Sequence, residues 1–295
     1  MTHYIILYNP LAGSGTGKDS AEKLKEKLNV QSQMIDITSI DDMRAFLHTL
    51  DADETIIIVG GDGTLSRFAC EIDGIDVRQK LTYYAAGSGN DFWTDLGLKQ
   101  GDMPVDVSSY VKSLPEIEVG GVTRKFLNGI GYGIDGYCCE VGDELREKRK
   151  KINYTAIAIK GLLFHYRPRE CTVTVDGRKY TYSRVWLAPT MNGRFYGGGM
   201  MPAPDQDRLS AEGKASIMLM FGAGKLRTLC VFPAIFSGKH VEHKKLVDVL
   251  SGDVITVSFD RPTPLQIDGE TVHDVTSYTV YSRAAVMARR EMAAC

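Results

Sequence analysis

The feature that most constrains the fold is the continuous apolar run Ile56-Ile57-Ile58-Val59, which ends in the glycine cluster Gly60-Gly61-Asp62-Gly63-Thr64. A strand without polar alternation is typical of a sheet that helices cover on both faces. The same order of strand, glycine-rich turn and helix opens the chain, with a strand over 4–8 and a helix over 20–28. A strand over 33–37 and a helix over 40–50 follow. The first half therefore predicts an α/β domain with a parallel sheet.

From about Lys125 the pattern changes to short β-rich runs that turn signals separate. The runs include Thr172 to Val175 and Val254 to Phe259, and one helical stretch over 141–164 interrupts them. We expect a β-rich C-terminal sandwich domain over residues 123–295, which would bind the substrate. It would follow an α/β nucleotide-binding domain over residues 1–122, and Gly120-Gly121 marks the boundary.

Composition excludes several classes of protein. Lysine and arginine number 35 against 37 acids, a formal net charge of -2, so no overall basic field indicates a nucleic-acid partner. No apolar run approaches the roughly 20 residues that span a bilayer. The first apolar run breaks at Asn9-Pro10, too early for a signal peptide. Six cysteines without a Cys-x-x-Cys pair fit a reducing cytoplasm, so we expect a cytoplasmic protein.

Three glycine-rich segments follow strands and are typical of phosphate binding. Ala12 to Asp19 fails as a Walker A loop, but it still offers backbone N–H groups at a helix start. Gly60 to Thr64 and Gly87 to Asp91 follow two further strands, where glycine lets the backbone approach a polyphosphate closely. Asp62 would then lie near the reacting hydroxyl or a phosphate-bound magnesium. A fourth run, Gly129 to Gly136, lies outside a β-α-β unit and does not indicate a dinucleotide site.

With these motifs the chain resembles the diacylglycerol kinase catalytic-domain family, which includes bacterial diacylglycerol and YegS-like lipid kinases and the sphingosine and ceramide kinases. The resemblance covers nearly the whole chain. Besides Asn9-Pro10 with Gly13 and the two later glycine motifs, it rests on Asn192-Gly193 with Gly197 to Gly199, and on Ile267-Asp268-Gly269-Glu270. It implies an N-terminal domain of the NAD kinase and diacylglycerol kinase type.

The resemblance also implies roles for particular residues. In that family ATP lies between the two domains, and the glutamate of the last motif is a proposed general base. The catalytic residues would be Glu270 and Asp62, and the cofactors ATP and Mg²⁺. The nucleotide-binding positions would be Asn9, Pro10, Gly13, Thr38, Gly60, Gly61, Gly63, Thr64, Ser66, Gly87, Ser88 and Asn90.

Two departures from the family pattern bear on these roles. The family continues its Gly-Gly-Asp-Gly-Thr motif with Leu-Asn-Glu, whereas this chain reads Leu65-Ser66-Arg67. Its magnesium loop, Leu-x-x-Asp-Gly-Leu, appears here as Leu209 to Lys214 with Glu212 in place of aspartate. If Mg²⁺ binds there, its ligands would be the Glu212 carboxylate and the carbonyls of Leu209 and Lys214. A solvated acidic turn without metal is the alternative.

The sequence thus predicts an ATP-dependent kinase that phosphorylates a hydroxyl of diacylglycerol or a related membrane lipid. The basic segment Arg146 to Lys151 precedes apolar residues, so contact with the inner membrane surface is expected, although a solvated helix face explains the same pattern. Two other readings remain open. One is a kinase of a soluble acceptor, as in NAD kinases, and the other is a catalytically silent lipid-binding regulator.

Overall fold

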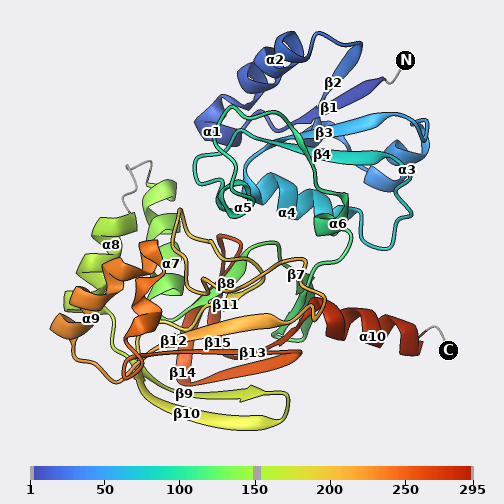
Figure 1. Ribbon diagram of the computed structural model, residues 1–295. Helices are drawn as coiled ribbons and strands as arrows, with labels where there is room; N and C mark the ends of the chain where they lie inside the picture. Colours follow the sequence, from blue (N-terminus) through green and yellow to red (C-terminus); the bar gives the residue numbers. More distant parts are fainter. Residues whose placement is uncertain (1–2, 149–153, 294–295) are drawn as a thin grey trace. The chain divides into compact units, whose positions relative to one another are not determined.

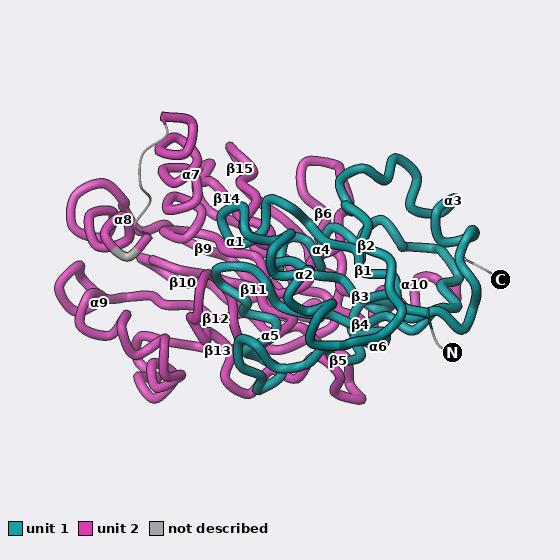
Figure 2. Tube along the Cα trace, turned by 90° about the horizontal axis from the view of Figure 1, so that it is seen from above, with its two compact units in different colours: residues 1–113 teal, residues 114–295 magenta. Residues whose placement is uncertain are grey.

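The computed structural model describes residues 3–148 and 154–293, and the chain divides into two compact units, residues 1–113 and 114–295 (Figures 1 and 2). The first unit is a five-stranded sheet in the order β2-β1-β3-β4-β5, in which only β5 is antiparallel to its neighbour. Its elements are β1 (Tyr4–Tyr8), α1 (Ala12–Gly15), α2 (Gly17–Leu28), β2 (Ser32–Asp36), the 3-10 turn η1 (Ile37–Ser39), α3 (Met43–His48), β3 (Thr55–Gly60), α4 (Asp62–Glu71), β4 (Lys80–Ala85), α5 (Asp91–Asp95), β5 (Val105–Asp106) and α6 (Ser108–Val111).

The central strand β3 is buried on both faces, as its composition predicts. Ile57 and Val59 pack in one core cluster with Leu24 of α2. The alternate residues Ile56 and Ile58, which point to the opposite face, are also fully buried. The α/β class and the parallel sheet are therefore confirmed.

One helix of this unit is shorter than predicted. The expected helix over 40–50 is α3, which spans Met43–His48. It begins there because the carboxylate of Asp42 accepts a hydrogen bond from the backbone N–H of Ala45 at 3.0 Å, which caps the helix. The preceding residues Ile37–Ser39 form the 3-10 turn η1 instead.

The second unit is built on antiparallel strands. The main path of its sheet is β13-β12-β11-β8-β14-β15-β6-β7, and β9 pairs with both β10 and β14. The elements are β6 (Glu116–Val119), β7 (Val122–Lys125), β8 (Gly129–Tyr132), α7 (Ile134–Glu147), α8 (Tyr154–Lys160), the π-helix η2 (Gly161–His165), β9 (Arg169–Val175), β10 (Arg178–Val185), β11 (Thr190–Met191), β12 (Ala215–Met220), α9 (Lys225–Val231), the 3-10 helices η3 (Phe232–Ser237) and η4 (Lys239–Glu242), β13 (Val247–Gly252), β14 (Val254–Ile267), β15 (Glu270–Tyr281) and α10 (Arg283–Ala293).

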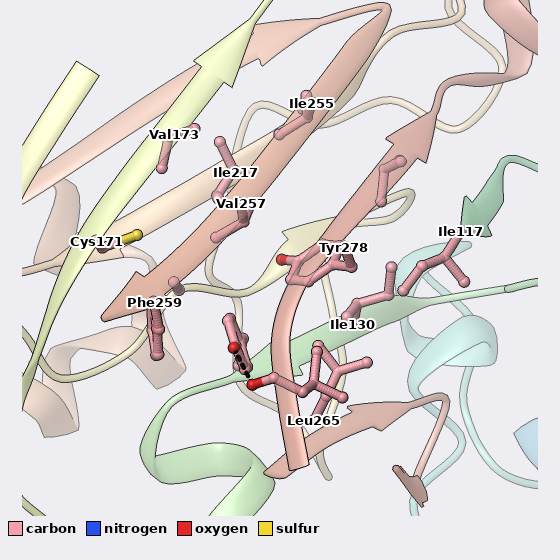
Figure 3. Close-up of a cluster of buried hydrophobic side chains, with 14 of the residues drawn as sticks. Ile117, Ile130, Cys171, Val173, Ile217, Ile255, Val257, Phe259, Leu265 and Tyr278 are labelled. Atoms are coloured by element: carbon pink, nitrogen blue, oxygen red, sulfur yellow. Dashed lines mark hydrogen bonds between the residues drawn. The ribbon is translucent and has the colours of Figure 1, made fainter. Parts of the chain in front are cut away.

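The long strand β14 organises the core of this unit. Its first part, Ile255–Phe259, pairs with β9, and its last part, Leu265–Ile267, pairs with β8. The register against β15 shifts between these parts, so the strand bends and serves two regions of the sheet. The buried side chains of both parts meet those of β6, β8, β9, β12 and β15 in one cluster (Figure 3). The predicted β-rich sandwich is confirmed.

The compact units divide at 113/114, whereas the domain boundary at 122/123 stays a prediction. Gly120 and Gly121, with φ of 58° and 77°, form the turn of the β6–β7 hairpin inside the second unit. Glycine stands there because the turn requires positive φ. The helix expected over 141–164 already begins at Ile134, and residues 149–153, which lie outside the described residues, separate α7 from α8. No described helix is long and apolar enough to cross a membrane.

Candidate active site

Three predicted phosphate-binding segments meet at one edge of the parallel sheet. Tyr8, Val59 and Tyr84 are paired across β1, β3 and β4, so the residues that follow these strands emerge side by side. The amide of Asn9 continues this pairing, since its N–H bonds the carbonyl of Val59 at 3.0 Å. The sequence motifs at the ends of these strands therefore belong to one site.

Asn9 ties two of the segments together. Its side-chain Nδ2 donates to Thr64 Oγ1 at 2.9 Å, and its Oδ1 accepts from the backbone N–H of Leu11 at 3.0 Å. Pro10 lies between these contacts in the turn that leads to α1. The hydroxyl of Thr64, which is buried, is held by this contact in the first turn of α4.

The second and third segments touch through their glycines. A Cβ added to Gly87 would lie 2.5 Å from Gly61 Cα, and one added to Gly61 would lie 3.1 Å from Gly87 Cα. Gly61 has a φ of -94°, so it needs no left-handed backbone. A Cβ on Gly60 would meet the Thr64 side chain at 2.5 Å. Gly60 and Gly87 therefore leave no room for a Cβ and Gly61 leaves little, whereas a Cβ on Gly63, also in the first turn of α4, would meet nothing within 4 Å.

Asp62 holds the third segment in place. Its carboxylate oxygens accept from the backbone N–H groups of Asp91 at 2.7 Å and Phe92 at 3.1 Å. It thereby caps α5, the short helix that follows the Gly87 turn. The structure thus gives Asp62 a positioning role that the sequence did not predict.

The third segment also bonds within itself. Asn90, with a φ of 52°, accepts from the N–H of Gly87 at 3.0 Å and donates to the carbonyl of Gly87 at 2.8 Å. These two contacts close the turn around Ser88, which is exposed. Beneath it, Tyr83 donates to the carbonyl of Gly60 at 3.0 Å. Burial, and secondarily the charge of Asp62, raises the pKa of the Tyr83 phenol, which therefore stays protonated as a donor.

The remaining predicted nucleotide-binding positions have different surroundings. Gly13, with a φ of 58°, packs against the same edge, because a Cβ there would lie 2.6 Å from the carbonyl oxygen of Ala86. Thr38 follows β2, and its N–H and hydroxyl both bond the carboxylate of Asp36 at 2.8 and 2.7 Å. Ser66 is buried inside α4, and its neighbour Arg67 is exposed and pairs with Glu71 at 2.8 Å. The departure Leu65-Ser66-Arg67 therefore places a cation one turn along α4 from Gly63.

In the second unit, Asp268 and Glu270 have different surroundings. Asp268, with a φ of 47°, accepts from the backbone N–H groups of Leu127 at 2.5 Å, Asn128 at 2.8 Å and Gly129 at 3.1 Å. Glu270 begins β15, and its side chain, 70% exposed, forms an ion pair with Arg124. Its role as the general base stays a prediction.

A buried polar network next to Asp268 was missed from the sequence. Arg208 is only 7% exposed, and its guanidinium donates to the carbonyl of Leu127 at 2.5 Å and to Asn128 Oδ1 at 2.6 Å. Asn192 donates to the same Leu127 carbonyl at 2.8 Å. Gly193 is required beside it, since a Cβ there would lie within 2.0 Å of the guanidinium. The Asn192-Gly193 motif was the available signal, but nothing in the sequence marks Arg208 as buried.

Asp135 is a buried carboxyl that the sequence did not single out. It lies in the first turn of α7 and accepts from Gln266 Nε2 at 3.0 Å. Burial raises the pKa of the Asp135 carboxyl to about 6. A Cβ on Gly131 would lie 1.5 Å from its Oδ2, so the glycine run over 129–136 makes room for this carboxyl. Shifted carboxyls of this kind are concentrated at functional sites, although structural examples also occur.

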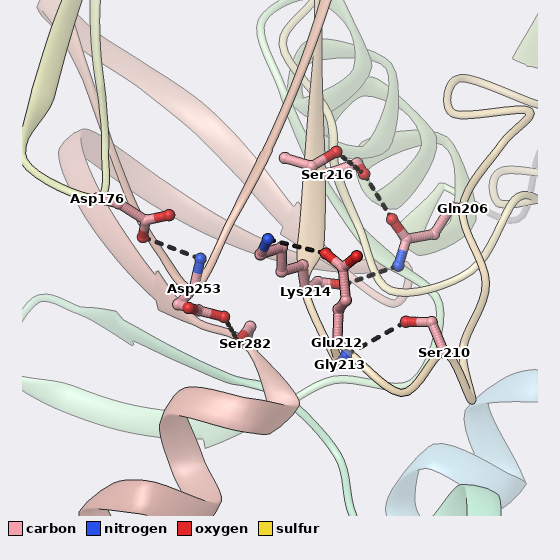
Figure 4. Close-up of polar contacts among 10 residues, drawn as sticks. Asp176, Gln206, Ser210, Glu212, Gly213, Lys214, Ser216, Asp253 and Ser282 are labelled. Carbon is pink, nitrogen blue, oxygen red and sulfur yellow. Dashed lines mark hydrogen bonds and ion pairs between the residues drawn. The ribbon is translucent and has the colours of Figure 1, made fainter.

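Two of the three predicted magnesium ligands, the Glu212 carboxylate and the Lys214 carbonyl, already have partners within the chain. Figure 4 shows the Glu212 carboxylate directed at the ammonium group of Lys214, with an oxygen to nitrogen distance of 2.8 Å. This hydrogen bond and the charge of Lys214 lower the pKa of Glu212. The carbonyl of Lys214 already accepts from Gln206 Nε2 at 2.9 Å. No group of three or more His, Cys, Asp or Glu side chains that could hold a metal occurs within 3–148 and 154–293.

Comparison with known proteins places both halves of the chain in one family. The diacylglycerol kinase catalytic domain matches residues 3–120, and the YegS C-terminal NAD kinase beta sandwich-like domain matches residues 128–286. A diacylglycerol kinase of Mycobacterium tuberculosis is 28% identical over 248 residues, which cover 80% of this chain and 79% of that protein. A diacylglycerol kinase of Bacillus subtilis is 24% identical over 221 residues, with 74% and 71% covered.

The solved structures agree on the fold. The crystal structure of a diacylglycerol kinase from Bacillus anthracis superimposes with a TM-score of 0.59 at 17% identity, and covers 95% of this chain and 94% of that one. At 17% identity this structural similarity shows the fold alone. The two domain matches follow one another along the chain, and the second alone covers more than half of its 295 residues. This protein therefore belongs to the diacylglycerol kinase catalytic-domain family, and it is a kinase.

Proposed function

We propose that this kinase transfers the γ-phosphoryl group of ATP to a hydroxyl of diacylglycerol or a closely related membrane lipid. In this reaction the hydroxyl oxygen bonds to the γ-phosphorus, and the bond from that phosphorus to the bridging oxygen breaks. ADP leaves, and the hydroxyl proton goes to a base. Most of the catalysis in such transfers comes from positioning and from neutralisation of phosphate charge.

The observation that carries the proposal is the packed set of glycine-rich loops at the carboxyl edge of the parallel sheet. Gly63 faces open space in the first turn of α4, a ten-residue helix whose backbone N–H groups attract anions at that end. Asn9, Thr64 and Asn90 hold the surrounding loops by side-chain hydrogen bonds. A polyphosphate is the ligand that this arrangement fits best.

Within this proposal Asp62 acts chiefly as a positioning residue, because its carboxylate fixes the start of α5 and with it the Gly87 turn. Glu270 is proposed as the acceptor of the hydroxyl proton, on the strength of the family resemblance. Its ion pair with Arg124 holds the carboxylate in one place at the start of β15.

Magnesium enters the proposal only as part of the nucleotide substrate, Mg-ATP, which neutralises phosphate charge. The loop over 209–214 does not favour a second, resident ion, because its one carboxylate is paired with Lys214 and the Lys214 carbonyl is hydrogen-bonded. No step of the reaction is assigned to a metal at this loop.

The lipid acceptor also implies a location. We propose that the protein acts in the cytoplasm at the inner surface of the membrane, where its acceptor lies. The test is a screen with γ-labelled radioactive ATP against mixed lipid extracts, diacylglycerol and NAD, with the labelled product identified by mass spectrometry. A labelled lipid phosphate is expected. Label in a soluble acceptor would indicate the NAD kinase-like alternative, and no label in any acceptor would indicate the silent regulator.

A further inference from the structure

A layer of short helices covers one side of the second unit. It comprises α8 with η2 and residues 166–167, and α9 with η3, η4 and the flanking residues, that is 154–167 and 222–247. Within it η2 contacts α9, α9 contacts η3, and η3 contacts η4. Lys225 of α9 also donates to the carbonyl of Leu163 in η2 at 2.6 Å. Figures 1 and 2 both show α8 and α9 side by side, so these segments, far apart in sequence, form one surface.

The layer exposes large apolar side chains although it already contributes others to the core. Leu162, Val231 and Ile235 are buried in the core cluster beneath it. In contrast, Phe164 is 73% exposed and Leu226 is 75% exposed. Phe236, 48% exposed, and Ile159, 43% exposed, add to the same elements. Exposed apolar groups on neighbouring elements mark an interaction site more often than chance placement does.

The charge of the layer is opposite to that of the chain. Its exposed basic residues are Lys160, Arg167, Lys225, Arg227, Lys239, Lys244 and Lys245, and its one acid is Glu242. Seven basic residues against one acid give the layer a formal charge of +6, whereas the whole chain carries -2. The rest of the chain, taken together, therefore has a negative net charge. A basic and apolar surface on an acidic protein points to an anionic and apolar partner.

We propose that this layer is the membrane-binding face, which docks on an anionic phospholipid bilayer. Phe164, Leu226 and Phe236 would enter the boundary between headgroups and acyl chains, and the basic residues would contact the anionic headgroups. An anionic bilayer offers both an apolar phase and a dense negatively charged surface. The proposal rests on the proposed function, since a kinase of a lipid acceptor must reach the bilayer that holds it.

This face differs from the basic segment that the sequence indicated. Of that segment, Arg146 pairs with Asp143 at 2.5 Å and Lys148 pairs with Glu144 at 3.5 Å, so acids on the same helix offset both charges. Residues 149–151 of the segment lie outside the described residues. The layer over 154–167 and 222–247, in contrast, has seven exposed basic residues and one acid.

The test is flotation of the full-length protein with vesicles of phosphatidylcholine and phosphatidylglycerol, and with vesicles of phosphatidylcholine alone. Binding is expected to the anionic vesicles and to fall as NaCl is raised from about 0.1 to about 1 M, because the screening length shortens from about 10 to about 3 Å. The double variant Phe164→Ser with Leu226→Ser should bind at least about tenfold more weakly. A matched variant, Val122→Ser with Met292→Ser, changes two apolar side chains that are 57% and 71% exposed on β7 and α10, and should bind like the wild type.

A charge pair provides an independent test that leaves the apolar groups intact. Arg227→Glu with Lys244→Glu should weaken vesicle binding by about fivefold or more per position. Lys23→Glu with Lys179→Glu makes the same change in total charge at exposed positions on α2 and β10, and should have little effect. Equal losses of vesicle binding in both charge variants would show that the charge of the whole protein, not one face, governs binding, and would overturn the proposal. Absence of wild-type binding to anionic vesicles would overturn it as well.

Failure of this proposal can be told apart from failure of the proposed function. Kinase activity on a short-chain, water-soluble diacylglycerol does not need a membrane, so the face variants should retain it while losing activity on vesicles. Vesicle binding without any lipid phosphorylation would remove the proposed function but leave the face. If the Phe164 and Leu226 variant binds vesicles normally but loses self-association in sedimentation, the layer is an interface between copies of the chain, and the membrane proposal is wrong.

Discussion

The contact between Gly61 and Gly87 allows a quantitative prediction for the substitution Gly87→Ala. A Cβ at Gly87 would lie 2.5 Å from Gly61 Cα and 2.9 Å from Asn90 Oδ1. Non-bonded carbon atoms prefer a separation of about 3.5–4.0 Å, so the two loops must move apart by about 1 Å. Overpacking of this kind costs about 1–3 kcal/mol of stability. A displacement of about 1 Å in a positioning loop lowers the rate by about a hundredfold.

The assays are chemical denaturation, nucleotide affinity by calorimetry, and kinase activity on the identified acceptor. Gly63→Ala is the matched control for stability, because Gly63 is also in the glycine cluster but a Cβ there meets nothing within 4 Å. In the first turn of α4 that alanine should leave the free energy of unfolding unchanged or raise it by up to about 1 kcal/mol. An unchanged stability and nucleotide affinity for Gly87→Ala would refute the inference that loop packing is what requires glycine there.

Three further changes test other parts of the structure. Asp62→Asn keeps one acceptor oxygen for the two backbone N–H groups of Asp91 and Phe92. It should therefore lower the free energy of unfolding by about 1 kcal/mol and kcat/KM by about a hundredfold, and near-normal activity would contradict a role in the site. Glu270→Gln should lower kcat strongly with little change in nucleotide affinity, whereas Arg124→Gln, which removes the partner of Glu270, should retain most of kcat; a Glu270→Gln enzyme within a fewfold of wild type would shift the base role elsewhere. Asp135 has a folded-state pKa of about 6, above its ordinary value of 3.8, so the stability that its neutral form supports is fully present below pH 3.8 and is lost as pH rises through 6. Asp135→Asn should remove that loss and raise the free energy of unfolding by up to about 3 kcal/mol at pH 7.5, with a smaller gain near pH 4. Denaturant titrations at both pH values measure the gain, and an equal gain at the two pH values would contradict the prediction.

The position of the candidate site could be predicted from the sequence because it depends on a pattern of short range. The apolar run over 56–59 could only be a strand buried on both faces, and the glycine clusters followed such strands directly. Parallel neighbours bring their carboxyl ends to one edge, so the three segments after Tyr8, Val59 and Ala85 had to meet. The location of the site therefore follows from local sequence patterns, without knowledge of contacts between distant residues.

The reason for each glycine could not be predicted in the same way. A glycine in a motif indicates that something approaches its backbone closely or that its φ is positive. Gly61 was expected to accommodate a phosphate, but its φ is -94° and the group nearest to an added Cβ is Gly87 Cα at 3.1 Å. The sequence does not record whether the neighbour is a ligand or another loop. Gly63, which has only open space around it, is the better candidate for contact with the nucleotide.

Arg208 illustrates the other limit. An arginine in an acidic loop, next to Asp205 and Asp207, is normally expected at the surface. It is buried because its guanidinium satisfies the carbonyl of Leu127 and the side chain of Asn128, about eighty residues earlier in the chain. Such a partner comes from the strand order of the sheet, in which β8 lies between β11 and β14. No local pattern around residue 208 contains that information.

Three of the five Asp-Gly pairs in the chain show how far a motif can support a chemical role. Asp62, Asp176 and Asp268 each accept backbone N–H groups from a distant segment: Asp62 from Asp91 and Phe92, Asp176 from Asp253 and Val254, and Asp268 from residues 127–129. Asp176 lies in the β9–β10 hairpin, which carries none of the predicted site residues. The same use of the carboxylate at a plain hairpin means that backbone capping is the common property of the three. A chemical role for Asp62 therefore has to be shown by activity measurements on Asp62→Asn. The loss in kcat/KM, expressed as a free energy, would have to be larger than the loss in the free energy of unfolding that the missing cap causes.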